Sequence, residues 1–139
     1  MAFSVLVVDD SSVVRSRLTE MLSEIDGVTH VDDAPGAAEA RLLLATTAPD
    51  VVVLDIRMPG GSGIDLLREI KSSGSRGFVI MLTNYPLAPY RSVCLRAGAD
   101  VFLDKSTELE AAVDIVRRLA IGPGQPVKVR AASLARRES

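Results

Sequence analysis

Four apolar runs in this sequence each lead into side chains that can do chemistry. The side chains are Asp9 with Asp10, Asp55, Thr83 and Lys105. Three carboxylates held close together repel one another unless a cation lies among them. Oxygen ligands without His or Cys suit a hard ion, Mg²⁺ before Zn²⁺, and bound Mg²⁺ leaves positions open to a phosphate. A carboxylate nucleophile, a metal, a lysine and a hydroxyl donor are the groups that phosphoryl transfer needs, so we expect phosphoryl chemistry here.

The elements that carry these residues read as alternating strands and helices. Val51–Leu54 is a continuous apolar run rich in β-branched residues, which is typical of a strand buried on both faces. Apolar residues at helical spacing follow each such run, and in the second helix we place Leu42, Leu43 and Leu44 on the packing side. The predicted strands are 5–8, 28–32, 51–54, 78–82 and 101–103, and the predicted helices are about 12–24, 35–47, 64–71, 86–97 and 107–119.

Five βα units in a row predict an α/β fold: a parallel sheet with helices on both faces and right-handed crossovers. Ligands of such sheets bind outside the carboxyl ends of the strands. Because all these ends lie on one edge, the polar residues after them converge. Asp55 alone would read equally well as a loop cap. Together with the other four residues it reads as the nucleophile.

Composition narrows the class of protein. At 139 residues, the chain has the length of one domain with a sizeable core. A formal net charge of −2 argues against direct nucleic-acid binding, and the single cysteine, Cys94, excludes an internal disulfide. The N-terminus lacks a basic n-region, and no apolar run approaches the length of a membrane span. We therefore expect a cytoplasmic protein that contacts no membrane.

With these motifs in place, the sequence resembles the receiver domain of two-component response regulators, and most nearly a single-domain, chemotaxis-type receiver. The motifs are Val7-Val8-Asp9-Asp10, Asp55 with Met58-Pro59-Gly60, Leu82-Thr83-Asn84 and Phe102-Leu103-Asp104-Lys105. The resemblance covers about residues 3 to 120. It implies a flavodoxin-like, doubly wound sheet of order 2-1-3-4-5 with five helices. We expect the receiver domain over 1–121 and a flexible, mildly basic tail over 122–139.

The resemblance assigns the chemistry residue by residue. Asp55 looks like the phosphoacceptor, which attacks the phosphohistidine of a sensor histidine kinase or phosphotransfer protein. Mg²⁺ would be held by Asp55, directly by Asp10, mainly through water by Asp9, and by the backbone carbonyl of Arg57. Lys105 would pair with Asp55 and then with the phosphoryl oxygens.

The same resemblance implies a switch. Thr83 would bind the phosphoryl group and move inward, and Phe102 matches the aromatic residue that changes rotamer with it. The added charge biases a two-state element. In this family that element is the surface of the fourth helix, fifth strand and fifth helix, here 87–97, 101–103 and 107–119, which would bind a downstream target protein and allows a homodimer.

These inferences lead to a stand-alone receiver in a two-component or phosphorelay pathway, a phosphoprotein and not an enzyme. The alternatives are a receiver cut from a longer regulator with an output domain, a binding module that has lost phosphorylation, and a Mg²⁺-dependent aspartyl phosphohydrolase. The dehalogenase-like members of that last class carry a second Asp two residues after the nucleophile, where this chain has Arg57.

Two departures from the family pattern lead to further expectations. Ser106 stands after Lys105, where many receivers have proline after a cis bond. A cis bond to a non-proline residue costs about 3–4 kcal/mol, so we expect either a trans bond with a shifted loop or a strained cis bond. Arg57 and Tyr85 are bulky and flank the route of an attacking water. We expect them to slow self-dephosphorylation.

Overall fold

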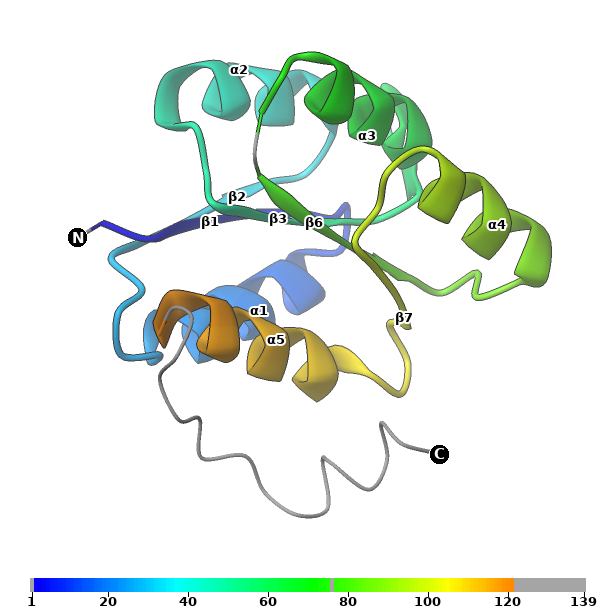
Figure 1. Ribbon diagram of the computed structural model, residues 1–139. Helices are drawn as coiled ribbons and strands as arrows, with labels where there is room; N and C mark the ends of the chain where they lie inside the picture. The colour runs from blue at the N-terminus through cyan, green and yellow to red at the C-terminus, as the bar shows by residue number, and fades with distance from the viewer. Residues whose placement is uncertain (1, 76, 122–139) are drawn as a thin grey trace.

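A parallel sheet flanked by helices organises the chain, as described by a computed structural model for residues 2–75 and 77–121 (Figure 1). The strands are β1 Ser4–Val8, β2 His30–Ala34, β3 Val51–Leu54, β4 Arg57–Met58, β5 Gly61–Ser62, β6 Phe78–Thr83 and β7 Val101–Asp104. The helices are α1 Ser12–Ser23, α2 Ala37–Thr47, α3 Gly63–Ser72, α4 Ala88–Arg96 and α5 Leu109–Ile121. The predicted tail, 122–139, lies outside the described residues.

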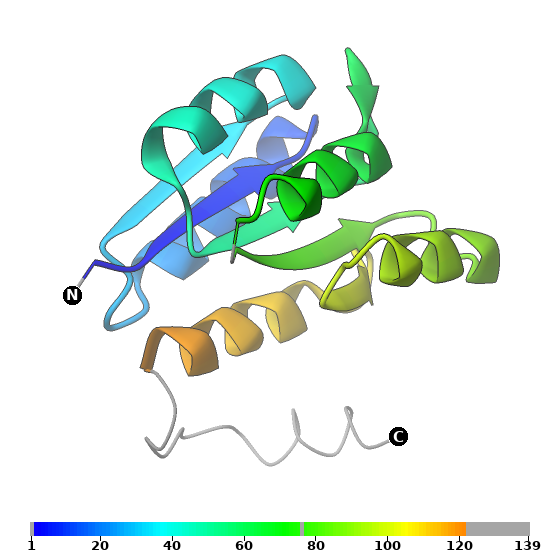
Figure 2. The same cartoon turned by 45° about the horizontal axis from the view of Figure 1, so that its top comes forward.

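The main sheet has the order β2-β1-β3-β6-β7, and each neighbouring pair is parallel. This confirms the predicted flavodoxin-like order with five helices. Figure 2 shows the arrows of the sheet pointing the same way, so the carboxyl ends of the strands share one edge. The short antiparallel pair β4–β5 forms beyond β3, in the loop that follows Asp55.

Two apolar layers hold the helices against the sheet. In β1, Leu6 and Val8 face the layer under α2 and α3, whereas Val5 and Val7 face the layer over α1 and α5. Successive strand side chains point to opposite faces, so a strand buried on both faces must be apolar at every position. That requirement explains the unbroken apolar runs. Figure 1 shows α1 and α5 together on one side of the sheet and α2 and α3 on the other.

Several details of the predicted elements differ from the structure: α5, for example, spans Leu109–Ile121 rather than 107–119, and α4 spans Ala88–Arg96 rather than 86–97. β2 spans His30–Ala34, two residues later than expected. The packing assignment in α2 was wrong for Leu42, which is 70% exposed, while Leu43 and Leu44 pack against the core. Three consecutive helical residues cover about 200° of the helix circumference, so they do not all face the sheet. None of the helices within residues 2–75 and 77–121 has the length and apolar character that a membrane span requires.

Candidate functional site

The site lies at the carboxyl-terminal edge of the sheet, where the ladder of backbone hydrogen bonds continues into the functional residues. Asp9 follows β1 and Asp55 follows β3. The Asp55 N–H donates to the carbonyl oxygen of Val8 at 3.1 Å, and the Lys105 N–H donates to that of Thr83 at 2.8 Å. Because the sheet fixes the backbone at these positions, the side chains start from a rigid frame.

Lys105 joins the two buried carboxylates. Its Nζ lies 2.6 Å from Asp9 Oδ2 and 2.7 Å from Asp55 Oδ2. Asp9 is 2%, Asp55 5% and Lys105 9% exposed, so the three charges are almost fully removed from water. The second oxygen of Asp55, Oδ1, accepts from the N–H of Ile56 at 2.7 Å. The Asp55 carboxylate is therefore held at both oxygens.

Burial and pairing shift the protonation of these groups. Burial raises the pKa of Asp9, because it penalises the charged form more than hydrogen bonds from Lys105 and the Ser11 N–H favour it. For Lys105, burial alone would lower the pKa, but hydrogen bonds to Asp55 and Asp9 outweigh that effect and the pKa is raised. The lysine therefore stays charged at neutral pH, whereas burial disfavours the ionised form of Asp9.

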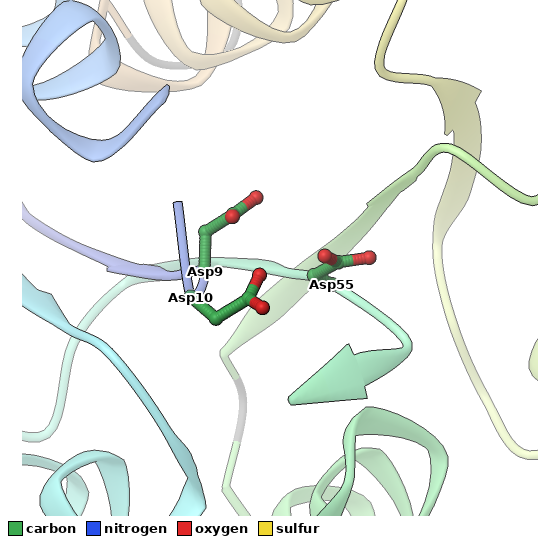
Figure 3. A group of neighbouring side chains, drawn as sticks. All are labelled: Asp9, Asp10 and Asp55. Carbon is green, nitrogen blue, oxygen red and sulfur yellow. The ribbon is translucent and has the colours of Figure 1, made fainter. Parts of the chain in front are cut away.

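Three carboxylates can supply ligands to one cation. Asp9, Asp10 and Asp55 each offer an oxygen, and these oxygens lie within 4.8 Å of one another (Figure 3). When all three are ionised, Lys105 balances one of the three negative charges. A hard divalent cation would neutralise the rest, and an all-oxygen donor set fits Mg²⁺. The predicted backbone ligand, the carbonyl of Arg57, is in β4, beyond Asp55.

The two predicted switch residues lie in different places. Thr83 is fully buried, and its hydroxyl oxygen accepts from the N–H of Tyr85 at 3.0 Å. Phe102 is buried in the layer that includes α4, and the guanidinium carbon of Arg91 lies 5.9 Å from the centre of its ring. Thr83 thus lies at the site and Phe102 beneath α4.

A cluster of one arginine and two tyrosines, which we call the Arg–Tyr cluster, borders the site. The guanidinium carbon of Arg57 lies 4.2 Å from the centre of the Tyr85 ring, and Arg57 Nη2 donates to the hydroxyl of Tyr90 at 3.2 Å. The tyrosine rings meet edge to face with centres 6.5 Å apart. Sequence reasoning singled out Arg57 and Tyr85 but missed Tyr90.

The peptide bond between Lys105 and Ser106 begins the loop after β7. All peptide bonds between described residues are trans, including Lys105–Ser106. Asp104 Oδ1 accepts from the Ser106 hydroxyl at 2.7 Å and from its N–H at 3.0 Å. These hydrogen bonds hold the pKa of Asp104 below its usual value. The first of the two expected alternatives, a trans bond, is correct.

Gly63 fits α3 against the loop that follows β3. Its N–H donates to the carbonyl oxygen of Ile56 at 2.7 Å, and a Cβ atom at this position would collide with the backbone carbonyl of Asp55. The hydroxyl of Ser62 accepts from the N–H of Ile64 and so caps the helix. Sequence reasoning did not select Gly63, because a close backbone approach leaves no mark except the glycine itself.

Known proteins match the chain over most of its length. The family described as response regulator receiver domain matches residues 5–117. Over 118 residues, the chain is 33% identical to the response regulator GacA of Pseudomonas aeruginosa, which covers 85% of this chain and 55% of GacA. It is also 33% identical over 119 residues to the response regulator UvrY of Escherichia coli K12, covering 86% and 55% of the two chains. The chain therefore spans about half the length of these curated relatives.

A solved structure shows the same fold. The signal receiver domain of a DNA-binding response regulator from Colwellia psychrerythraea superposes with a TM-score of 0.79 at 26% identity. The match covers 86% of this chain and 98% of that one.

Proposed function

The chain belongs to the receiver-domain family of response regulators, and on this premise we propose that it accepts a phosphoryl group on Asp55 from a histidine kinase or phosphotransfer protein. The observation that carries the proposal is the contact of Lys105 Nζ with both Asp55 and Asp9 beside a third carboxylate, Asp10. This arrangement supplies a nucleophile, a fixed ammonium and oxygen ligands at one point.

The transfer follows from these positions. A carboxylate oxygen of Asp55 attacks the phosphorus of the partner's phosphohistidine, the P–N bond breaks, and the imidazole leaves with the electron pair and takes up a proton. The product is an acyl phosphate on Asp55. Lys105 Nζ, already within hydrogen-bond distance, moves with the new charge onto a phosphoryl oxygen, and the Thr83 hydroxyl donates to another.

Mg²⁺ is the proposed cofactor, held by Asp9, Asp10, Asp55 and the backbone carbonyl of Arg57. When bound, it would supply positive charge that stabilises the equatorial phosphoryl oxygens. The protein's own contribution is to hold carboxylates together that would otherwise repel one another. Lys105 does this in the structure by pairing with Asp9 and Asp55.

The phosphorylated protein itself is the signal. Each chain accepts one phosphoryl group and is not proposed to turn over a substrate as an enzyme does. The readout surface consists of α4, β7 and α5, with Phe102 beneath α4. A downstream target, an output domain or a second copy would bind it. The stand-alone form stays a prediction, and the mass of the native protein in its source organism tests it. A cytoplasmic location is likewise proposed from family membership.

Fluoroberyllate, a phosphoryl mimic, tests the proposal. We expect it to bind only with Mg²⁺ and to lose binding in Asp55→Ala. An exposed carboxylate outside the site provides the matched control, Asp26→Ala, which should bind like the wild type. A phosphohydrolase would instead turn over p-nitrophenyl phosphate, and a module that has lost phosphorylation would bind no fluoroberyllate at any Mg²⁺ concentration.

A further inference from the structure

The Arg–Tyr cluster joins three segments around the phosphoacceptor. Arg57 belongs to the loop after β3, Tyr85 to the loop after β6, and Tyr90 to the first turn of α4. The N–H of Tyr85 donates to the hydroxyl oxygen of Thr83, so the cluster is joined to the site by a direct hydrogen bond. Arg57 itself is two residues after Asp55. The guanidinium therefore lies between the two loops that flank the acceptor.

Arg57 is a cation whose partners are neutral. Its contacts, among the described residues, are the ring of Tyr85 and the hydroxyl of Tyr90, and it makes no ion pair with a described carboxylate. The other cations near the site are already engaged. Lys105 pairs with Asp9 and Asp55, and Arg15 pairs with Asp33 at 2.9 Å and donates to the Asp9 carbonyl.

Phosphorylation changes the charge that these cations face. With Mg²⁺ bound, the three carboxylates and Lys105 are balanced. An acyl phosphate carries about one negative charge more than the carboxylate it replaces. A guanidinium binds phosphoryl oxygens through two parallel N–H donors, which is stronger than a hydrogen bond to a phenol or a cation–π contact at an exposed site.

We propose that Arg57 is a reserve cation for the phosphorylated state: it leaves Tyr85 and Tyr90, binds the phosphoryl oxygens, and so releases the start of α4. The inference rests on the proposed function and adds a link from the site to the readout surface. It makes Arg57 a positioning residue for the phosphoryl group and Tyr90 its competitor.

The start of α4 is suited to such a release. Its N-cap residue, Leu87, makes no side-chain capping hydrogen bond. Within α4, which the structure describes in full, only Cys94 is buried. The hydrogen bond from Arg57 to Tyr90 therefore ties the first turn of α4 to the loop after β3. Its loss would free that first turn, while the buried Cys94 keeps the rest of α4 in the core.

Intrinsic fluorescence tests the release, because the sequence holds two tyrosines, Tyr85 and Tyr90, and no tryptophan. Tyr85→Phe keeps the ring and leaves Tyr90 as the single emitter. We expect Mg²⁺ with fluoroberyllate to change its emission. The change should disappear in the double variant Y85F/R57Q and persist in the matched control Y85F/R96Q, which removes an exposed arginine at the end of α4.

The affinity for fluoroberyllate gives a second test, in which two variants should change binding in opposite directions. If tyrosine and phosphoryl group compete for Arg57, Arg57→Gln weakens fluoroberyllate binding by about tenfold, the effect of one charge-assisted hydrogen bond. Tyr90→Phe removes the competing hydroxyl and tightens binding by about threefold. If Arg57 instead stays on the two tyrosines in the phosphorylated state, neither variant should tighten fluoroberyllate binding. Tyr90→Phe binding no more tightly than the wild type would overturn the inference.

Failure of the inference differs from failure of the proposed function. Acetyl phosphate labelling of Asp55 is measured in the same proteins. A Tyr85→Phe protein that takes up the label but shows unchanged Tyr90 emission contradicts the role of Arg57 and leaves phosphoryl transfer in place. Wild type that neither takes up the label nor binds fluoroberyllate contradicts both.

Discussion

Lys105 donates to Asp55 at 2.7 Å between side chains that are 50 positions apart in the sequence. The sheet makes this contact, since β3 and β7 both end at the same edge with β6 between them. The lysine also reaches Asp9. One ammonium thus stabilises a pair of buried carboxylates.

Removing the ammonium should destabilise the fold. Lys105→Met leaves Asp9 and Asp55 buried without their shared partner, and we expect a loss of about 3 kcal/mol in the free energy of unfolding at pH 7 without Mg²⁺. Urea denaturation measures it. Because the pKa of Lys105 is raised above 10.5, this contribution is complete below pH 10.5 and is lost as the pH rises through the folded value.

Lys71→Met provides the matched control for that substitution. Lys71 pairs with Asp100 in a half-exposed position, so its loss should cost about 1 kcal/mol or less. Equal effects of the two substitutions would show that the buried site has no special role in stability.

The buried Asp9 carboxyl should lower the free energy of unfolding at neutral pH. Its pKa is raised above 3.8, so the folded protein holds the proton more tightly than the unfolded chain. That preference stabilises the fold below pH 3.8 and is lost as the pH rises through the raised value. In EDTA at pH 7, Asp9→Asn should therefore unfold at a higher urea concentration than the wild type, and the difference should shrink below pH 3.8.

The surface variant Asp26→Asn should show no such gain. Added Mg²⁺ should stabilise the wild type more than Asp9→Asn, because a ligand has been removed. An Asp9→Asn protein that is less stable than the wild type in EDTA at pH 7 would contradict the prediction.

Gly63 should tolerate no side chain. A Cβ atom would collide with the Asp55 carbonyl, which belongs to the backbone, so either α3 or the acceptor loop must move. We expect Gly63→Ala to cost about 1–3 kcal/mol in thermal or urea unfolding. Ser72→Ala, an exposed position at the other end of α3, should stay within about 0.5 kcal/mol. Unchanged stability in Gly63→Ala would contradict the close approach.

Tyr85 should prolong the life of the acyl phosphate. Its ring contacts Arg57 in the unphosphorylated structure, and Tyr85 stands two residues after Thr83, where a bulky side chain flanks the route of an attacking water. Tyr85→Ala opens this route to water, and we expect the decay of radiolabelled acyl phosphate with Mg²⁺ to accelerate several-fold. Leu87→Ala, an exposed position on the same loop, should leave the rate unchanged. Loss of the label within seconds from the wild type would contradict a slowing role.

Much of the fold follows from the sequence because the three central strands of the main sheet are buried on both faces. That burial requires unbroken apolar runs, and β1, β3 and β6 carry them. β2 was less well placed, since its sequence His-Val-Asp-Asp-Ala has two adjacent acidic residues and no apolar run, and the strand lies at the edge of the sheet. The placement of Leu42 on the packing side of α2 was wrong because composition alone does not determine which face of a helix packs against the sheet.

The site divides in the same way. Asp9, Asp55 and Lys105 were predictable because each stands at a strand end, and strand ends share an edge. Tyr90 was not, because its contact with Arg57 joins residues 33 positions apart through a loop and a helix that no pattern fixes. Gly63 likewise depends on how closely two backbones approach.

The most direct test of the account is Mg²⁺-dependent labelling by acetyl phosphate, read by intact mass and mapped by peptide analysis. The account predicts one phosphoryl group per chain, located on Asp55, absent with EDTA and absent in Asp55→Asn. Labelling that persists in Asp55→Asn, or no labelling of the wild type with Mg²⁺, would contradict it.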